Sequence, residues 1–322
     1  MEARRRHGFR YYSAQILENA AMKSFPVISH IFFIIFAAVI AWPAATGDIP
    51  WHLLALGILV EVITLVWQQL SKERDKRISS GDVSTVVFLN LIVWQLSTAR
   101  FELLDKMLFP PPEAVLTLFI SELPDMLKGL VKSLILLVSG YSLALATAIP
   151  LGLLIGWRGR LYRAVNPFTK VLGPIPPIVF IPYAITLLPS FRAASIFVIF
   201  IGAFWPLFIN TLNGVFNIPK GLLDSARVLN LKERTLLLRV ILPGAMPSIC
   251  TGATLALVLA FVLLTAAELI GANSGVGWYV KNFADFADYP RVIVGIIFIS
   301  IVVTVITWGT ERVERRLLRW RN

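Results

Sequence analysis

Long uninterrupted apolar runs dominate the pattern of hydrophobic and polar positions along the chain. Eight of these runs come close to or exceed the roughly 20 residues that an α-helix needs to cross a bilayer. They cover residues 25–45, 51–70, 83–101, 133–157, 171–191, 193–219, 244–270 and 292–310. They are too long and continuous for the alternating strands of a membrane β-barrel. The pattern therefore predicts an all-α polytopic membrane protein with about eight transmembrane helices.

The composition supports this class of protein. The 322 residues are 57% hydrophobic and only 15% charged, and the mean hydropathy is +0.75, whereas soluble domains carry about 25% charged residues. A soluble globule could not bury so much apolar surface, and a disordered chain has the opposite balance. A soluble enzyme and a disordered protein are therefore excluded. Cys250 is the only cysteine and there are three histidines, so we expect neither an internal disulfide nor a metal site.

The positions of the lysines and arginines predict the orientation in the membrane. If every run spans, five segments lie on one side and hold 23 of the 30 basic residues, namely 1–26, 71–82, 157–170, 217–240 and 311–322. The positive-inside rule then places this side, and with it both termini, in the cytoplasm. We therefore expect a multi-pass protein of the plasma (inner) membrane. We interpret the net charge of +11 as topogenic charge beside anionic lipid, and not as a nucleic-acid-binding surface.

The first run has a second possible interpretation. Arginines such as Arg4 and Arg10 precede it, and small residues at 43–45 could form the exit of a cleaved signal peptide. The run is longer than a usual signal-peptide core, which favours an uncleaved span. The charge count is compatible with both, because the next span would keep its direction.

The chain divides into two regions of unequal size. Residues 1–82 form two spans joined by a short outer turn at 46–50, and they end in a charged cytoplasmic stretch at 71–82. We predict that this is an additional membrane hairpin, and that residues 83–322 form a core of six spans. No internal repeat is visible, which disfavours transporter folds built from two related halves.

The fifth run contains four prolines, at positions 174, 176, 177 and 182. Each proline removes a backbone donor and disturbs a helical turn. A broken helix at membrane depth is tolerated only where it is buried in protein or lines a water-filled cavity. The run is therefore either a helix that lines or gates a pathway, or a kinked packing helix.

Two runs contain a carboxylate, which is costly in a membrane and suggests function. Glu268 could line a pathway or hold an outer gate; alternatively, it caps backbone donors or pairs with Lys281 or Arg291. Glu61 most simply hydrogen-bonds a neighbouring helix, and the alternative is a proton or substrate site. An ion-coupled secondary transporter or channel using Glu61 and Glu268 is therefore a second functional hypothesis. A membrane enzyme is disfavoured, because no paired carboxylates, His clusters or Ser/His sets converge.

The longest inner loop, residues 219–243, has the pattern of two short helices. Pro219 suits a first helical turn, and Asn230 is a plausible stop because asparagine tolerates the left-handed conformation that ends helices. Four apolar residues share one face of the first helix: Leu222, Leu223, Ala226 and Leu229. A second helix is expected from about Lys232 until Pro243 breaks it. Physically, the loop could lie on the bilayer or dock a partner.

The residues of this loop resemble the EAA motif of binding-protein-dependent ABC importer permeases, which reads E-A-A, three residues, G, nine residues, I-x-L-P. All spacings agree when the counterparts are Asp224, Ser225 and Ala226, then Asn230, Val240, Leu242 and Pro243. The substitutions are conservative: aspartate keeps the charge, serine keeps the small size, and asparagine can adopt the backbone angles of glycine.

Further landmarks resemble the nitrate/sulfonate/bicarbonate (taurine-type) permeases in the same order along residues 109–320. They are the segments 109–113, 127–134, 150–157, 174–177, 209–211, 267–268 and 275–278. The resemblance does not cover residues 1–82.

This resemblance implies the transmembrane domain of a type I ABC importer, which moves a small anionic solute by alternating access. Such a permease is half of a pore and is usually paired with a copy of itself. The chain has no G-x-x-x-x-G-K-[ST] sequence, so we expect no enzyme activity and no cofactor in it. ATP and Mg²⁺ would belong to a separate ABC ATPase subunit, and an extracytoplasmic substrate-binding protein would deliver the solute.

Two sets of site residues follow from the resemblance. The ATPase-coupling set is Asp224, Ser225, Ala226, Arg227, Asn230, Leu231, Leu242 and Pro243. The translocation-pathway set is Pro176, Pro177, Asn210 and Glu268. The sequence does not identify the transported substrate, because selectivity in such systems lies largely with the binding protein.

Overall fold

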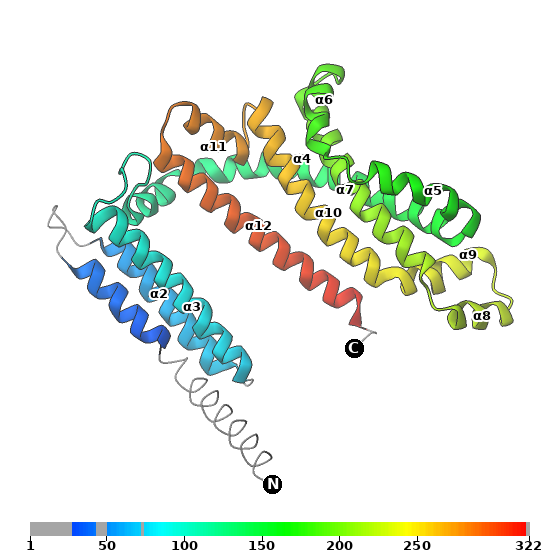
Figure 1. The fold of residues 1–322 in the computed structure, drawn as a ribbon, viewed down its shortest axis with the longest axis horizontal. Coiled ribbons are helices and arrows are strands. Elements are labelled where there is room, and N and C mark those ends of the chain that lie inside the picture. Colours follow the sequence, from blue (N-terminus) through cyan, green and yellow to red (C-terminus); the bar gives the residue numbers. More distant parts are fainter. Residues whose placement is uncertain (1–27, 43–49, 72–73, 320–322) are drawn as a thin grey trace, which may run out of the picture. The chain divides into compact units, whose positions relative to one another are not determined.

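The computed structural model describes residues 28–42, 50–71 and 74–319, and every regular element in these ranges is helical. The chain divides into two compact units (Figure 1). The first comprises residues 1–121 and 288–294, and the second comprises residues 122–287 and 295–322. The two long helices α4 and α12 each contribute to both units.

The first unit packs three helices around a small aromatic and aliphatic core. They are the helix Ile28–Ala41, α2 (Trp51–Leu70) and α3 (Arg74–Gln95), which continues into the π-helical turn η1 (Leu96–Arg100). The core residues are Phe36, Ile40, Leu53, Phe88 and Ile92. Helix α3 overlaps the third predicted span. It packs against the two spans of the predicted hairpin, so these three spans form one unit.

Helix α4 (Pro112–Trp157) is 46 residues long and begins well before the predicted span at 133. Pro112 begins the helix because proline fits a first helical turn, and Pro124 and Pro150 lie inside the helix without ending it. Within the second unit, glycines of α4 allow α7 to approach closely. A Cβ at Gly140, Gly152 or Gly156 would lie 2.7–2.8 Å from side-chain atoms of α7.

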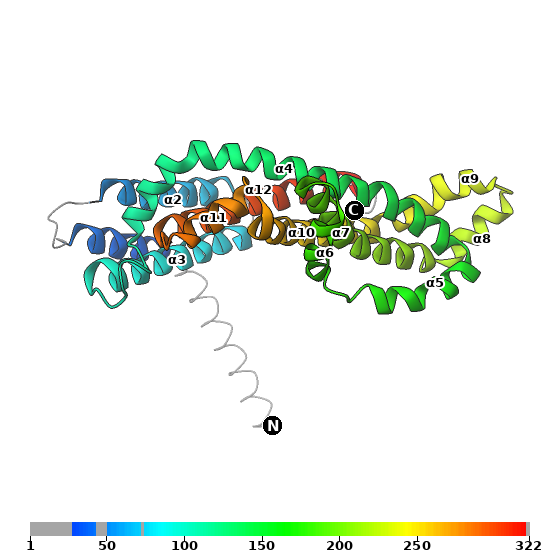
Figure 2. The ribbon, with the colours of Figure 1, turned by 90° about the horizontal axis from the view of Figure 1, so that it is seen from above.

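The centre of the second unit is the pair α7 (Phe191–Phe216) and α10 (Leu242–Gly271), which run side by side (Figures 1 and 2). Small residues permit this contact: a Cβ at Gly252 of α10 would lie 2.7 Å from the Cβ of Asn210 on α7. The short helix α11 (Val276–Asp285) follows α10, and α12 (Tyr289–Leu317) completes the chain.

The fifth predicted span, residues 171–191, does not form a continuous helix. The chain instead forms α5 (Gly159–Leu172), the 3₁₀ turn η2 (Pro177–Phe180) and α6 (Ile181–Leu187), with a 79° bend between α5 and the η2–α6 segment. The break lies at residues 173–176, where the closely spaced prolines remove backbone donors and clash with the preceding turn. The expectation of a broken helix at these prolines is therefore confirmed.

In the described part of the chain, six helices are long and apolar enough to cross a membrane, or seven if α5 with η2–α6 counts as one broken span. The helix Ile28–Ala41 is apolar but shorter, and the ends of the first predicted span, 25–45, lie outside the described residues, as do Arg4, Arg10 and the possible cleavage site at 43–45. The structure confirms an all-helical, multi-span architecture.

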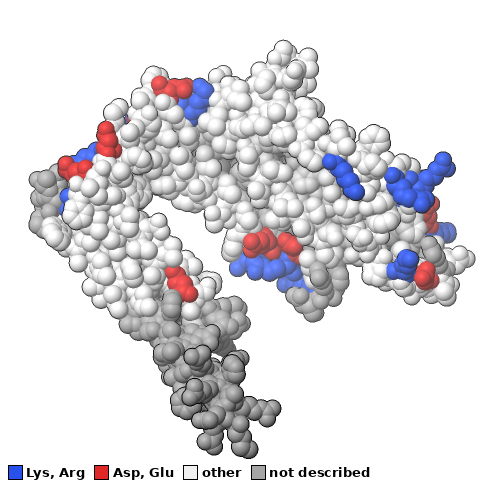
Figure 3. Space-filling model, in the orientation of Figure 1, with Lys and Arg blue, Asp and Glu red and all other residues white. Residues whose placement is uncertain are grey.

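Basic side chains of the second unit gather near helix ends. On the face drawn in Figure 3, Lys and Arg lie over α5, beside α8 (Lys220–Val228) and at the C-terminal end of α12, and almost none lie over the middle of α10. These positions correspond to the segments that the sequence places on the cytoplasmic side. An apolar middle with charged ends is what a bilayer-spanning bundle requires.

Candidate functional site

The predicted coupling loop forms a short helix with a defined end. Helix α8 covers Lys220–Val228, and Asn230 follows two residues later with φ +50°. This is the left-handed conformation, which asparagine adopts more readily than most residues with a Cβ atom. The predicted helix stop at Asn230 is therefore confirmed.

One side of α8 packs against the protein while its C-terminal end is exposed. Ala226 is only 4% exposed, and a Cβ at Gly244 would lie 3.7 Å from the side chain of Leu222. Val228 and Leu229 are 86% and 71% exposed. The sequence placed Leu229 on the same helical face as Ala226, but Leu229 lies beyond the end of the helix and so leaves that face.

The second half of the loop differs from the prediction. Helix α9 (Glu233–Leu236) and the π-helical turn η3 (Leu237–Ile241) continue directly into α10, so residues 233–271 form one helical stretch. The prediction that Pro243 breaks this helix is wrong. In the turn before it, the N–H of Leu242 bonds to the carbonyl of Leu237. Pro243 then lies in the first turn of α10, where a missing N–H is tolerated.

The structure brings most of the predicted coupling set together. Asp224 and Ser225 lie on the exposed part of α8, and the Ser225 hydroxyl donates to the carbonyl of Gly221 at 2.8 Å. Leu231 is half-buried directly after Asn230. Arg227 belongs to α8, but its side chain is outside the described residues. Two further members, Leu242 and Pro243, begin α10.

The predicted pathway residues do not form one cluster. Pro176 and Pro177 lie where α5 is separated from η2. Asn210 donates to the carbonyl of Pro206 at 2.8 Å, and its Cβ faces Gly252 at the α7–α10 contact. Glu268 lies 16 residues further along α10 than Gly252, which corresponds to about 24 Å of helix. Asn210 and Glu268 are therefore far apart.

Glu268 caps the start of α11. It is completely buried, accepts a hydrogen bond from the Ser133 hydroxyl at 2.5 Å, and accepts the backbone N–H of Gly277 at 2.7 Å. The Ser133 oxygen in turn accepts the N–H of Val276 at 3.0 Å. Gly275, with φ +131°, approaches the carboxylate so closely that a Cβ there would overlap it. Of the two interpretations drawn from the sequence, the geometry favours the cap.

The alternative ion-pair partners of Glu268 are engaged elsewhere. Lys281 pairs with Asp285 at 2.6 Å, and Arg291 pairs with Asp288 at 2.5 Å. The contribution of Ser133 to this cap was not predicted from the sequence. The only signal was a serine at the start of a predicted span, and the position of a serine alone does not identify a partner 135 residues away.

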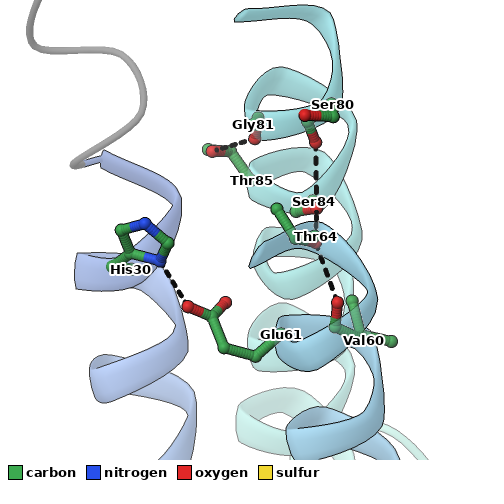
Figure 4. Close-up of polar contacts among 8 residues, drawn as sticks. All are labelled: His30, Val60, Glu61, Thr64, Ser80, Gly81, Ser84 and Thr85. Carbon is green, nitrogen blue, oxygen red and sulfur yellow. Dashed lines mark hydrogen bonds and ion pairs between the residues drawn. The ribbon is translucent and has the colours of Figure 1, made fainter. Parts of the chain in front are cut away.

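Glu61 of the first unit pairs with His30 from the neighbouring helix Ile28–Ala41 (Figure 4). This confirms the simpler expectation that Glu61 bonds an adjacent helix. Figure 4 also shows a hydroxyl contact between Thr64 of α2 and Ser84 of α3. The two hydroxyl oxygens are 2.5 Å apart. These polar contacts join the three helices inside an otherwise apolar unit.

The described residues contain no group of three or more His, Cys, Asp or Glu side chains that could hold a metal ion.

Comparison with protein families and curated proteins agrees with this geometry. Residues 148–319 match the family model described as binding-protein-dependent transport system inner membrane component. This segment includes α8, the α7–α10 pair and all of α12. The chain therefore belongs to this family, the permeases of ABC transporters.

Three relatives identify the surrounding branch of the family. A putative ABC transporter permease of Methanocaldococcus jannaschii is 32% identical over 73% of this chain and 90% of its own length. The putative aliphatic sulfonates transport permease SsuC of Escherichia coli is 34% identical over 71% of this chain and 87% of its own. The nitrate import permease NrtB of Leptolyngbya laminosa is 36% identical over 51% of this chain and 58% of its own.

The fold is also similar to a solved transporter. The match is to a chain of the MetNI methionine ABC transporter in an inward-facing conformation, with a TM-score of 0.53 and 20% identity, over 61% of this chain and 98% of the other. The likeness supports the type I importer fold. The named relatives confirm the resemblance to nitrate- and sulfonate-type permeases.

Proposed function

We propose that this chain is the membrane subunit of an ATP-driven importer for a small anionic solute of the nitrate, sulfonate or bicarbonate kind. The family membership supports the transport role, and the names of the relatives NrtB and SsuC support the solute class. The chain provides the path through the membrane, and ATP hydrolysis takes place on a separate ATPase subunit that holds ATP and Mg²⁺.

The observation that carries this proposal is the shape of α8. It is a short helix fixed to the bundle through Ala226, ended by a left-handed residue at Asn230, and followed by exposed apolar side chains. A helix with a packed side and an exposed apolar end suits insertion into a groove of a partner protein. We assign that groove to the ATPase subunit, with Asp224, Ser225, Arg227 and Leu231 completing the contact.

The continuity of residues 233–271 suggests how force would reach the membrane. Because α9, η3 and α10 form one helical stretch, a displacement of the docked segment moves α10, and α10 is packed along α7. Nucleotide-driven closure of two ATPase subunits would therefore rock the bundle between inward- and outward-open states. A flexible loop could not transmit such a displacement.

The remaining partners follow from the same assignment. We propose that two copies of the chain form the pore, that an extracytoplasmic binding protein delivers the solute, and that both termini are cytoplasmic. Anionic lipid would face the basic segments. Our candidates for the pathway remain the break at Pro176 and Pro177 and the side chain of Asn210 at the α7–α10 contact. Glu268 contributes to the pathway by fixing the position of α11.

The N-terminal residues 1–82 would be an added membrane module outside the transport core at 83–322. Helix α3 begins in this module and continues into the start of the core, and its residues Phe88 and Ile92 pack against the first two helices; α3 would therefore anchor the module to the core.

Reconstitution tests the proposal against ion-coupled transport. The chain is placed in liposomes with its ATPase subunit and binding protein, and uptake of labelled nitrate and of taurine is measured. We expect uptake that requires ATP and stops with ADP. Uptake driven by a proton or sodium gradient without ATP would contradict the proposal. The ion-coupled alternative is not favoured, because Glu61 and Glu268 both have partners within their own units.

A further inference from the structure

A small pocket of about 230 Å³ opens at the end of the second unit where α7 begins and α10 finishes. Two cationic side chains line it, Lys132 of α4 and Arg192 of α7. Asn273 and Ser274, from the loop between α10 and α11, add polar groups, and three apolar side chains complete the wall. The pocket thus combines residues from three separate segments.

The charges in this pocket are uncompensated. No acidic side chain lines it, and neither Lys132 nor Arg192 has an ion-pair or hydrogen-bond partner among the described residues. One turn earlier on α4, Lys128 pairs with Asp125 at 2.7 Å. Both side chains are exposed to solvent, so water screens their mutual repulsion and leaves both groups available, and an anion that enters the concave site would be attracted by both charges at once.

The walls of the pocket are held in place. Ser133, the neighbour of Lys132, bonds both to Glu268 and to the N–H of Val276, which ties α4 to the loop that carries Ser274. On the other side, Ser190 accepts the N–H of Ala193 and caps α7. Arg192 therefore lies in a fixed first helical turn, where the helix dipole also favours an anion.

The pocket lies at the end of the α7–α10 pair where a delivered solute would enter. α7 runs from the pocket towards α8, and α10 returns from the coupling loop to the pocket, so the two sites lie at opposite ends of this helix pair. The charge pattern of the sequence predicts that the end opposite to α8 faces the outside. That is the side on which a binding protein would release its ligand.

We propose that this pocket binds one small oxyanion, a nitrate or the sulfonate group of an aliphatic sulfonate, as the first site that the solute occupies in the permease. The inference rests on the proposed import function. The guanidinium of Arg192 can hold two oxygens of a planar or tetrahedral oxyanion, Lys132 supplies a second positive charge, and Asn273 and Ser274 supply neutral hydrogen-bond donors. The volume accommodates a group of this size with a few waters.

Protection of Lys132 from acylation tests the site without requiring transport. The full chain is placed in phosphatidylcholine nanodiscs at low ionic strength without chloride, and it is treated with an amine-reactive ester. The modification rate of each lysine is followed by peptide mass spectrometry. Nitrate and methanesulfonate are the probes, and dimethyl sulfone is the neutral comparison. We expect both anions to slow modification of Lys132 at least threefold and to leave Lys128 unchanged, and dimethyl sulfone to have no effect.

Variants make the outcome specific. Arg192→Gln should raise the anion concentration needed for half-maximal protection of Lys132 about tenfold, because it removes charge-assisted hydrogen bonds. Lys128→Gln, a matched loss of charge on the same helix, should leave protection intact. Equal labelling of Lys132 with and without the anions would overturn the inference. Replacing a third of the lipid by phosphatidylglycerol should give no protection by itself; protection by that lipid alone would identify a lipid site and also overturn the inference.

Uptake by the reconstituted importer separates this inference from the proposed function. The double variant Lys132→Gln/Arg192→Gln should raise the KM for the delivered anion about tenfold or more. If the double variant transports like the wild type, the pocket inference fails while the importer assignment stands. If the wild type imports no anion although Lys132 is protected, the solute class is wrong while the site stands.

Discussion

The backbone of Asn230 provides a graded test of the coupling segment. This residue has φ +50°, a conformation that glycine adopts freely and asparagine tolerates. For other residues with a Cβ atom, the left-handed conformation costs roughly 1–2 kcal/mol, and a β-branched residue is a true outlier there. Proline cannot adopt it, because its ring fixes φ near −65°. Asn230→Gly, Asn230→Ala, Asn230→Val and Asn230→Pro therefore form a series of increasing strain.

The free-energy cost of the left-handed conformation predicts how much more weakly each variant binds the ATPase subunit. If the turn is needed for docking, the fraction of permease in the competent conformation falls with the cost of the turn, and the apparent Kd rises by the same factor. A cost of 1 kcal/mol corresponds to about fivefold and 2 kcal/mol to about thirtyfold. We expect Asn230→Gly to bind like the wild type, Asn230→Ala about fivefold more weakly, Asn230→Val about thirtyfold more weakly, and Asn230→Pro not measurably.

The assay is a titration of the purified ATPase subunit onto the permease in nanodiscs, with size-exclusion chromatography as a check that each variant inserts. Asn217 is the matched control: it is exposed and ends α7 directly before the same loop, but its φ is −90°. Asn217→Ala should therefore change the Kd by less than twofold. Equal binding by Asn230→Pro and the wild type, or weakest binding by Asn230→Gly, would refute the reasoning.

Three further predictions concern contacts inside the membrane. Glu268→Gln loses one acceptor of the α11 cap and should lower the free energy of unfolding by about 1–3 kcal/mol, seen as a lower Tm, whereas Glu311→Gln on the exposed end of α12 should leave the Tm unchanged; equal Tm values for the two variants would contradict the cap. Gly252→Val forces α10 away from α7, because its Cβ position is 2.7 Å from the Cβ of Asn210, and should abolish a monodisperse chromatography peak, whereas Gly159→Ala, with open space around it, should behave as the wild type. His30→Ala leaves a buried carboxylate unpaired in the first unit and should speed amide hydrogen exchange in α2; unchanged exchange there would argue against a structural role for the pair.

The sequence predicts the large features of the fold because they depend on local patterns. The apolar runs place α2, α7 and α10 within a few residues of their observed ends, since a bilayer demands length and apolarity in every spanning helix. The stop at Asn230 was also predictable, because a left-handed helix end requires a residue of this kind.

Features that depend on packing were not predictable in the same way. Prolines illustrate this: those near residue 174 break the chain, yet Pro124 and Pro150 lie inside α4 and Pro243 lies inside the stretch 233–271. The difference arises from local adjustment, such as the π-helical turn before Pro243, and from neighbouring helices that support the chain. Only the structure shows which proline has that support.

The candidate site shows the same division. The position and end of α8 follow from residue types along one segment. The capping of α11 by Glu268 depends on Ser133, and the cationic pocket joins Lys132 of α4 with Arg192 of α7. Such pairings arise from the tertiary arrangement of helices, which no local sequence pattern records.

Site-specific crosslinking from Leu229 tests the central claim most directly. This side chain is 71% exposed beside the end of α8, and Leu255, which is 50% exposed on α10, is the comparison position. A photoreactive phenylalanine analogue is placed at either position in the permease, and the ATPase subunit is added. We predict an adduct between position 229 and the ATPase and none between position 255 and the ATPase. Adducts of position 229 with lipid alone, at a saturating concentration of the ATPase, would contradict the account.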